Sequence, residues 1–123
     1  MMVKIDTREK FHVITIHEAD LAANMTEKMD KVILTLLDDN VKNVIINMKD
    51  IKIMDSAAAN HLVKLHDEFY DAKASLVICE LQAEVKNSLE DAGTLEKLNY
   101  TPTESEAMDI VQMEEIEREF GEF

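Results

Sequence analysis

Two short apolar segments, residues 44–48 and 76–79, constrain the fold of this chain more than any other feature of its sequence. Each has the length and composition of a strand that is covered on both faces of a sheet. Between them, apolar residues recur at steps of three and four, which is the spacing of one face of a helix. These residues are Ala58, Leu62, Leu65, Phe69 and Ala72. A strand, a helix and a strand in this order predict parallel pairing in an α/β sheet.

The flanking segments continue this alternation. Residues 3–5 and 11–17 have the pattern of strands, and residues 99–101 are suited to a short last strand. Residues 25–37 carry a second helical face. Its apolar members are Met25, Met29, Val32, Ile33, Leu36 and Leu37.

Two further helices are indicated in the last third of the chain. Val85 and Leu89 mark a short helix that Gly93 can end, because glycine accepts the left-handed conformation that follows many helices. Thr103 and Glu106 have the spacing of a capping box, in which each residue satisfies a free backbone N–H of the first turn. The capping box predicts the start of a final helix.

Together these patterns predict an open α/β sheet of about four to five strands with about four helices. The length of 123 residues suffices for one hydrophobic core, and we expect one domain over residues 1–113. The acidic segment 114–123 is expected either to extend the last helix or to fray.

The formal net charge of −13 narrows the choice of partners. A surface this acidic repels nucleic acids and anionic lipids, so we expect no direct binding to either. A basic protein partner is its natural complement, although solubility alone also explains such a charge. No apolar run has the length of a membrane span, and the single Cys79 excludes an intramolecular disulfide. The expected location is the cytoplasm, with no membrane contact.

The histidines and the cysteine are weak candidates for chemistry. His61 and His66 are five residues apart, so a helix turns them away from each other, and ligands of one metal on a helix are spaced by three or four. His12 and His17 fall on opposite faces of a strand and are expected at the surface. Cys79 ends a buried strand and is expected to be a core thiol. We expect neither a metal nor a cofactor.

The strongest candidate site is the pair Asp55-Ser56, where a strand gives way to a helix. Asp55 is suited to accept hydrogen bonds as the N-cap, which places Ser56 at the first helical position with its hydroxyl at the helix mouth. A phosphate on Ser56 meets the positive end of the helix dipole and changes the charge of the surrounding surface. An Asp-Ser pair is also an ordinary way to begin a helix, so these residues alone leave both interpretations open.

The segment around this pair resembles a known signature. Residues 47–56, Asn-Met-Lys-Asp-Ile-Lys-Ile-Met-Asp-Ser, are similar to the strand, short hydrophobic linker and Asp-Ser helix start of bacterial anti-sigma factor antagonists, which are STAS domains. The order and spacing of residues 76–79, of Val85-Lys86 with Leu89, and of Gly93 are typical of the later half of these domains. The resemblance extends over about residues 3–111.

The resemblance implies a regulated binding protein and not an enzyme. In this family, a serine kinase of the histidine-kinase-like ATPase fold, the anti-sigma factor, binds the unmodified domain and phosphorylates the serine that follows the aspartate. That serine corresponds to Ser56, with Asp55 as the helix cap beside it. A metal-dependent serine phosphatase reverses the modification. The partner-binding surface implied for this chain comprises Asp20, Ala57, Ala58, Asn60, His61 and Lys64.

Two other functions are compatible with the residues. The domain could be a constitutive STAS subunit of a larger signalling or transport complex, in which Ser56 is never phosphorylated. It could also be a small flavodoxin-like enzyme that uses Asp55 or Ser56, but Asp55 is the only potential base beside Ser56 and is expected to act as the cap.

The chain differs from the family signature at two points. The family commonly continues Asp-Ser-Ser/Thr-Gly, whereas this chain has Ala57 and Ala58, which adds a methyl group where the backbone and a partner approach closely. The Gly-Glu-Leu-Asp segment that precedes the first long helix in the family is replaced by Glu-Ala-Asp-Leu at residues 18–21.

Overall fold

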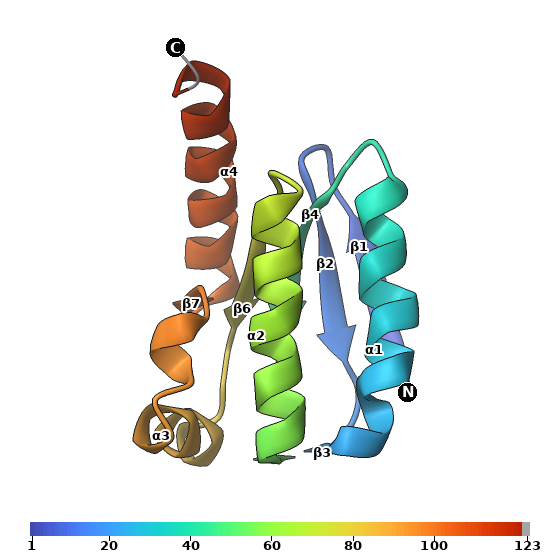
Figure 1. Ribbon diagram of the computed structural model, residues 1–123, viewed down its shortest axis with the longest axis vertical. Helices are drawn as coiled ribbons and strands as arrows, with labels where there is room; N and C mark the ends of the chain where they lie inside the picture. The colour runs from blue at the N-terminus through green and yellow to red at the C-terminus, as the bar shows by residue number, and fades with distance from the viewer. Residues whose placement is uncertain (122–123) are drawn as a thin grey trace.

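Five strands form the central sheet of this protein, with helices on both of its faces (Figure 1). The structure is a computed structural model that describes residues 1–121. The strands are β1 (Val3–Thr7), β2 (Phe11–Ile16), β3 (Asp20–Leu21), β4 (Asn43–Asn47), β5 (Ile53–Met54), β6 (Leu76–Cys79) and β7 (Tyr100–Thr101). The α-helices are α1 (Thr26–Ile33), α2 (Ser56–Asp71), α3 (Ala83–Asp91) and α4 (Glu104–Phe120), and the 3-10 helices are η1 (Ala23–Met25), η2 (Leu34–Asp38) and η3 (Leu95–Lys97). The predicted α/β fold is confirmed.

The order of strands in the main sheet is β1-β2-β4-β6-β7. The four strands from β2 to β7 run parallel, and helices lie between them in the sequence as predicted. Strand β1 pairs with β2 in the antiparallel sense. The reason is local, because residues 8–10 join the two strands in a hairpin closed by a bond from Arg8 N–H to Phe11 C=O, with no helix between them.

A second sheet of two very short strands was not predicted. In it, β3 pairs in parallel with β5, so that Asp20 lies opposite Ile53 and Leu21 opposite Met54. The Ala19 carbonyl extends this contact by accepting bonds from the N–H groups of Lys52 and Ile53. This small sheet holds the segment before the first helices against the segment that leads into α2.

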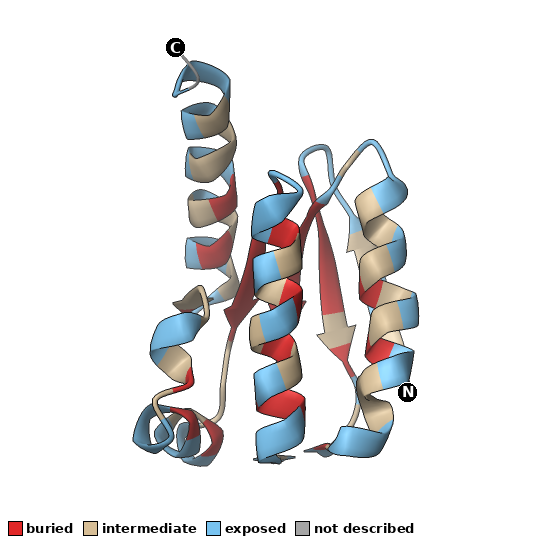
Figure 2. Cartoon of the chain, viewed as in Figure 1, coloured by how far each residue is buried: buried red, intermediate tan, exposed pale blue. Residues whose placement is uncertain are grey.

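The core has two parts, one on each face of the main sheet. Helices α1, α2 and α3 cover one face, and Figure 2 shows the buried side of α2 turned toward the strands. Buried residues of this larger part include Ile14, Ile46, Leu62, Leu65 and Phe69. Helix α4 covers the other face, where Ala107 and Val111 pack against residues of β2, β4 and β6. The apolar pattern of α2 therefore identified a true core face from Ala58 to Phe69. The prediction fails at Ala72, which follows the end of the helix and is exposed.

The predicted helix over residues 25–37 is a composite. It begins as η1, continues as α1 and ends as η2, which closes with a bond from Asp39 N–H to Leu36 C=O. Met29 and Ile33 are fully buried, whereas the other apolar positions of this face are only partly buried. Three of these positions, Met25, Leu36 and Leu37, lie in the 3-10 turns, where the helical period that would align them with Met29 and Ile33 is not kept.

The prediction that His12 lies at the surface is wrong. Its side chain is 2% exposed, because both ring nitrogens have protein partners. Nδ1 lies 2.8 Å from the Thr7 hydroxyl and Nε2 lies 2.8 Å from the Val41 carbonyl oxygen. A carbonyl can only accept, so Nε2 carries the proton and donates it to Val41. His17 is exposed, as predicted, and its Nδ1 lies 2.8 Å from Asp50 Oδ2.

The final helix begins where the capping pattern placed it. The Thr103 side chain accepts a bond from Glu106 N–H, and the helix continues without a break to Phe120. Of the two alternatives for residues 114–123, extension of the helix therefore holds through Phe120. Residues 122 and 123 lie outside the described part of the chain. The Glu114 side chain accepts a hydrogen bond from Ser75, and the Glu115 side chain accepts one from Asn43.

Candidate functional site

Helix α2 begins at the Asp-Ser pair. Asp55 has the extended backbone of an N-cap, and its Oδ1 accepts a bond of 2.8 Å from Ala58 N–H. Ser56 is the first helical residue and is exposed. Within residues 1–121, no group forms a hydrogen bond with the Ser56 hydroxyl. The local geometry therefore leaves this hydroxyl accessible at the positive end of a helix dipole.

Asp55 does more than cap the helix. Its second oxygen, Oδ2, accepts a bond of 3.0 Å from the backbone N–H of Ala23, at the start of η1. The backbone bonds from Ala58 and Ala23 lower the pKa of this carboxyl group below its ordinary value. Both oxygens are therefore occupied, and a carboxylate of lowered pKa is a weak base, which disfavours Asp55 as a catalytic base for Ser56.

The small sheet places the predicted residue Asp20 beside this helix start. Asp20 is exposed and pairs with Ile53 two residues before Asp55. The Leu21 carbonyl accepts a bond of 3.1 Å from Asp55 N–H. Residues 18–21 therefore lie against the Asp-Ser pair, although their sequence differs from the family segment.

A shallow hollow of about 190 Å³ lies beside Ser56. Ser56, Ala59 and Asn60 form one wall, and Ser88, Leu89 and Thr94 contribute to the opposite side. Helix α3 was predicted, but its contribution to this site was not. A signal in the sequence existed, because α3 follows the carboxyl end of β6, which is adjacent to β4 in a parallel sheet.

The predicted partner-binding residues of α2 divide by exposure. Ala57, Asn60 and Lys64 are exposed and lie on one side of the helix with Ser56. His61 is partly buried, and its Nε2 lies 2.6 Å from Asp30 Oδ1, so it links α2 to α1. These four residues can contribute to a contact surface.

The prediction that Ala58 belongs to the partner-binding surface is wrong. Its side chain is 0% exposed and belongs to the core, because the third residue of α2 turns its methyl group toward the sheet. The difference from the glycine of the family signature therefore places the extra methyl group in the core, where it does not face a partner. Its backbone N–H still bonds to Asp55, as any residue at this position can.

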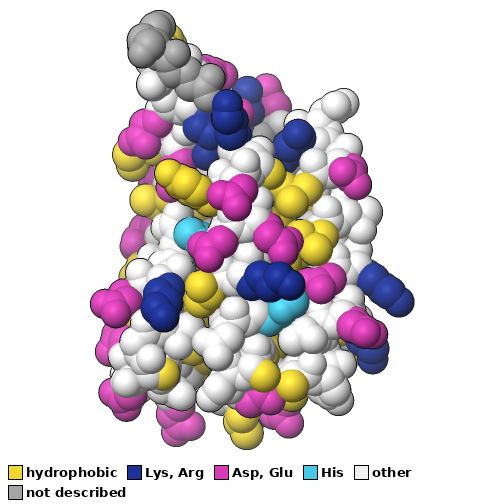
Figure 3. Space-filling model, in the orientation of Figure 1, with side chains coloured by type: hydrophobic (Ala, Val, Ile, Leu, Met, Phe, Trp, Pro, Cys, Tyr) yellow, Lys and Arg dark blue, Asp and Glu magenta, His cyan; other side chains and the backbone are white. Residues whose placement is uncertain are grey.

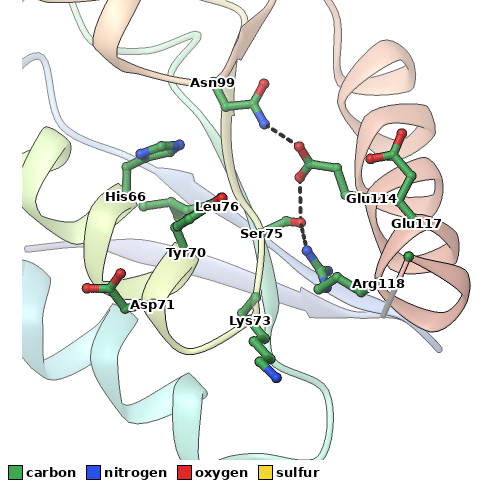
Figure 4. Close-up of a pocket in the computed structure, with 12 residues that line it drawn as sticks. His66, Tyr70, Asp71, Lys73, Ser75, Leu76, Asn99, Glu114, Glu117 and Arg118 are labelled. Atoms are coloured by element: carbon green, nitrogen blue, oxygen red, sulfur yellow. Dashed lines mark hydrogen bonds between the residues drawn. The ribbon is translucent and has the colours of Figure 1, made fainter. Parts of the chain in front are cut away.

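A cavity of about 560 Å³ lies where β6 begins, at the opposite end of the strands from Ser56 (Figure 4). Ser75, which precedes β6, forms its floor, and its hydroxyl lies 2.6 Å from Glu114 Oε1 and 3.1 Å from Arg118 Nη1. Asn99 also donates to Glu114, at 3.2 Å. These polar groups bond to one another and join α4 to the strands beside the cavity, which does not include Ser56.

The surface carries few cations beside its many carboxylates, and in Figure 3 acidic side chains are spread over the visible face. No helix of residues 1–121 is long and apolar enough to cross a membrane. Cys79 is fully buried, and burial raises the pKa of its thiol to about 12, with smaller contributions from Glu104 and Glu80. The thiol is therefore a core group, as predicted.

Comparisons with known proteins place this geometry in context. The sequence model of the STAS domain matches residues 2–107, and no curated protein sequence gives a significant match. Among solved structures, the chain is similar to an anti-sigma factor antagonist (STAS) domain protein from Planctomyces limnophilus, with a TM-score of 0.74 and 15% identity, over 89% of this chain and 97% of that one.

Two further structures are informative. The phosphorylated form of the Bacillus cell fate determinant SpoIIAA gives a TM-score of 0.63 at 17% identity, over 89% of this chain and 99% of that one. The murine anion transporter Slc26a9 gives 0.70 at 17% identity, over 85% of this chain but only 18% of the transporter. At these identities the likeness establishes the fold, which occurs both alone and within a larger protein.

Proposed function

Because this chain belongs to the STAS domain family, we propose that it is a protein-interaction switch controlled by phosphorylation of Ser56. Unmodified, it binds a serine kinase of the histidine-kinase-like ATPase fold, which acts as an anti-sigma factor. The kinase transfers a phosphoryl group from ATP to the Ser56 Oγ, with ADP as the other product and the hydroxyl proton passing to the kinase. A metal-dependent serine phosphatase removes the group. The chain itself is a substrate and a binding partner.

The observation that carries this proposal is the exposed hydroxyl of Ser56 at the first position of α2. It has no hydrogen-bond partner among residues 1–121, so a kinase can approach it without breaking a native contact. The fold is shared with a protein that has been solved in a phosphorylated form, SpoIIAA from Bacillus. The net charge of −13 favours a partner with a basic contact surface.

The proposed contact surface is continuous around Ser56. It comprises Ala57, Asn60 and Lys64 on the exposed side of α2, Asp20 on β3, and the hollow between α2 and α3. Phosphorylation adds nearly two negative charges at the edge of this hollow. A bound partner has to desolvate this phosphate, and we expect this cost to exceed the attraction of a basic contact surface, so the complex is weakened at the contact itself.

The test begins with the native state of the protein. Affinity capture from the cells that make it, with phosphopeptide mapping of the captured chain, is expected to return an ATPase-fold serine kinase and a phosphate on Ser56. Calorimetric titration against that kinase then compares wild type, phosphoprotein, Ser56→Ala and Ser56→Asp. We expect Ser56→Ala to bind as wild type does and phosphoprotein to bind about tenfold or more weakly, a difference of about 1.4 kcal/mol. Ser56→Asp carries one charge and is expected to fall between them.

Ser105 provides a matched control, because it is also an exposed serine in the first turn of a helix, α4. Ser105→Ala and Ser105→Asp are expected to change neither phosphorylation nor kinase affinity. Equal affinities of all the Ser56 forms contradict the switch. A phosphate found on Ser105 and not on Ser56 also contradicts it.

A constitutive subunit of a larger complex is the second candidate function. It is favoured by the likeness to the STAS portion of Slc26a9, where the same fold is 18% of a transporter. This function predicts a stable stoichiometric complex that forms equally with wild type and Ser56→Asp, and a chain without phosphate on Ser56.

A further inference from the structure

Helix α4 has two apolar faces, and within residues 1–121 only one of them packs against the rest of the fold. Ala107 and Val111 are fully buried against the sheet. Met113, Ile116 and Phe120 are 50%, 56% and 61% exposed. Their spacing of three and four residues places them on one side of the helix. We call these three residues the outer stripe.

The outer stripe lies beyond the residues that match the STAS family model. The STAS match ends at residue 107, whereas the stripe begins at Met113. The last turns of α4 rise beyond the end of the sheet, away from the start of α2 (Figure 1). A partner on the stripe can therefore be bound independently of a partner at Ser56.

Carboxylates border the stripe. Asp109 lies one turn before Met113, and Glu117 and Glu119 lie between Ile116 and Phe120 in the sequence. All three are exposed, and none forms an ion pair with a cation within residues 1–121. The whole helix carries seven acidic residues and one arginine, Arg118. Arg118 is engaged on the other side by Asn43, Ser75 and Glu115.

We propose that the outer stripe of α4 docks a basic amphipathic helix of a partner protein. Residues spaced by three and four are the seam by which two helices pack side by side. Lysines or arginines beside the apolar seam of the partner then meet Asp109, Glu117 and Glu119. In Figure 3, hydrophobic and acidic side chains lie next to each other along the edge of the molecule where α4 stands in Figure 1.

The charge of this chain selects against the other possible occupants. A second copy brings another net charge of −13 and juxtaposes two acidic helices, which repel each other. An anionic membrane surface is repelled for the same reason. A basic helix is the occupant that satisfies both the apolar residues and the carboxylates.

The test uses a synthetic peptide of three heptads with Leu at positions a and d and Lys at positions e and g, whose like charges oppose self-pairing. It is titrated into the full-length isotope-labelled protein and followed by NMR and fluorescence anisotropy. We expect shifts centred on Met113, Ile116 and Phe120. The variant M113Q/I116Q/F120Q is expected to bind about tenfold or more weakly, because the seam contributes only if its apolar groups are present. Met2→Gln, a change at another exposed apolar residue, is the matched control and is expected to bind normally.

Two control peptides separate the seam from charge alone. One has Glu in place of every Lys, and the other has the same composition in scrambled order. Both are expected to bind about tenfold or more weakly than the basic heptad peptide. Equal binding of the scrambled peptide, or equal binding of the stripe variant, overturns the proposal. A concentration-dependent dimer that the stripe variant lacks, or binding to phosphatidylglycerol vesicles through the stripe, also overturns it. Ser56→Ala is expected to leave peptide binding unchanged, so this result is independent of the proposed switch.

Discussion

Asn43 is the polar residue on which the junction between the sheet and α4 depends. It is the first residue of β4 and is 4% exposed. Its Nδ2 donates to the Lys10 carbonyl and, at 2.8 Å, to Glu115 Oε2. Its Oδ1 accepts from Ser75 N–H at 2.9 Å and from Arg118 Nη2 at 3.0 Å. All four hydrogen bonds that its amide can make are therefore formed.

The cost of Asn43→Ala can be estimated from these contacts. The N–H of Ser75 is buried and loses its acceptor, which costs about 1–3 kcal/mol. Glu115 and Arg118 remain paired at 3.1 Å and are partly exposed, with side-chain exposures of 34% and 26%. Their loss of one partner adds about 0–1 kcal/mol. We expect a total loss of about 1–4 kcal/mol, or about 4–15 °C in Tm for a chain of this length.

The loss has a pH-dependent part. The hydrogen bond from Asn43 is the main cause that lowers the pKa of Glu115, and Arg118 lowers it further. Burial acts in the other direction and raises the pKa. A carboxyl whose pKa is lowered on folding stabilises the fold above its unfolded pKa, about 4.3, and loses this contribution as the pH falls through the folded value. The difference between wild type and Asn43→Ala is therefore expected to be largest near pH 7 and smaller below about pH 4.

Urea unfolding of both proteins at several pH values measures these quantities. Asn87→Ala is the matched control, since Asn87 is exposed on α3. A loss for Asn43→Ala no larger than that for Asn87→Ala refutes the reasoning about Ser75. A difference that does not change with pH refutes the role assigned to Glu115.

Two further predictions test the core. Leu65→Ala is expected to lower the free energy of unfolding by about 2–5 kcal/mol, because Leu65 is fully buried on α2. Lys64→Ala, on the exposed side of the same helix, is expected to change it little. Equal urea midpoints for the two variants contradict the packing. Burial is the main cause that raises the pKa of the Cys79 thiol to about 12. We therefore expect Cys79 not to react with Ellman's reagent at pH 8 until urea unfolds the protein. Rapid reaction of the native protein contradicts the burial.

The sequence predicted the main elements because their signals are local. The strands β4 and β6 are nearly continuous apolar runs, and the buried positions of α2 recur with the helical period over sixteen residues. The small sheet of β3 and β5 gave no such signal, since strands of two residues are too short to show a period. It is specified by tertiary pairing of segments far apart in the chain.

The residues that were misplaced are those whose environment comes from distant segments. His12 looks like a surface residue until Val41, 29 residues away, supplies an acceptor for its ring. No prediction was made for Asn43, whose partners are also distant and include Ser75, 32 residues away, and Arg118, 75 residues away. Ala58 was assigned to the contact surface from the family signature, although the helical period had already placed it on the buried face.

The relative size of the forces at the start of α2 determines how a switch at Ser56 can act. A negative charge at a helix N-terminus contributes about 0.3–1 kcal/mol at an exposed site, and its sign here is favourable. The helix is held by Leu62, Leu65 and Phe69, which are fully buried, and truncation of any such residue costs about 2–5 kcal/mol. We therefore expect a phosphate on Ser56 not to unfold α2, because its interaction with the helix dipole is favourable and is smaller than the contribution of any one of these core residues. It has to act where a partner would desolvate it, so thermal melts of wild type and Ser56→Asp should nearly coincide even if their affinities for the kinase differ.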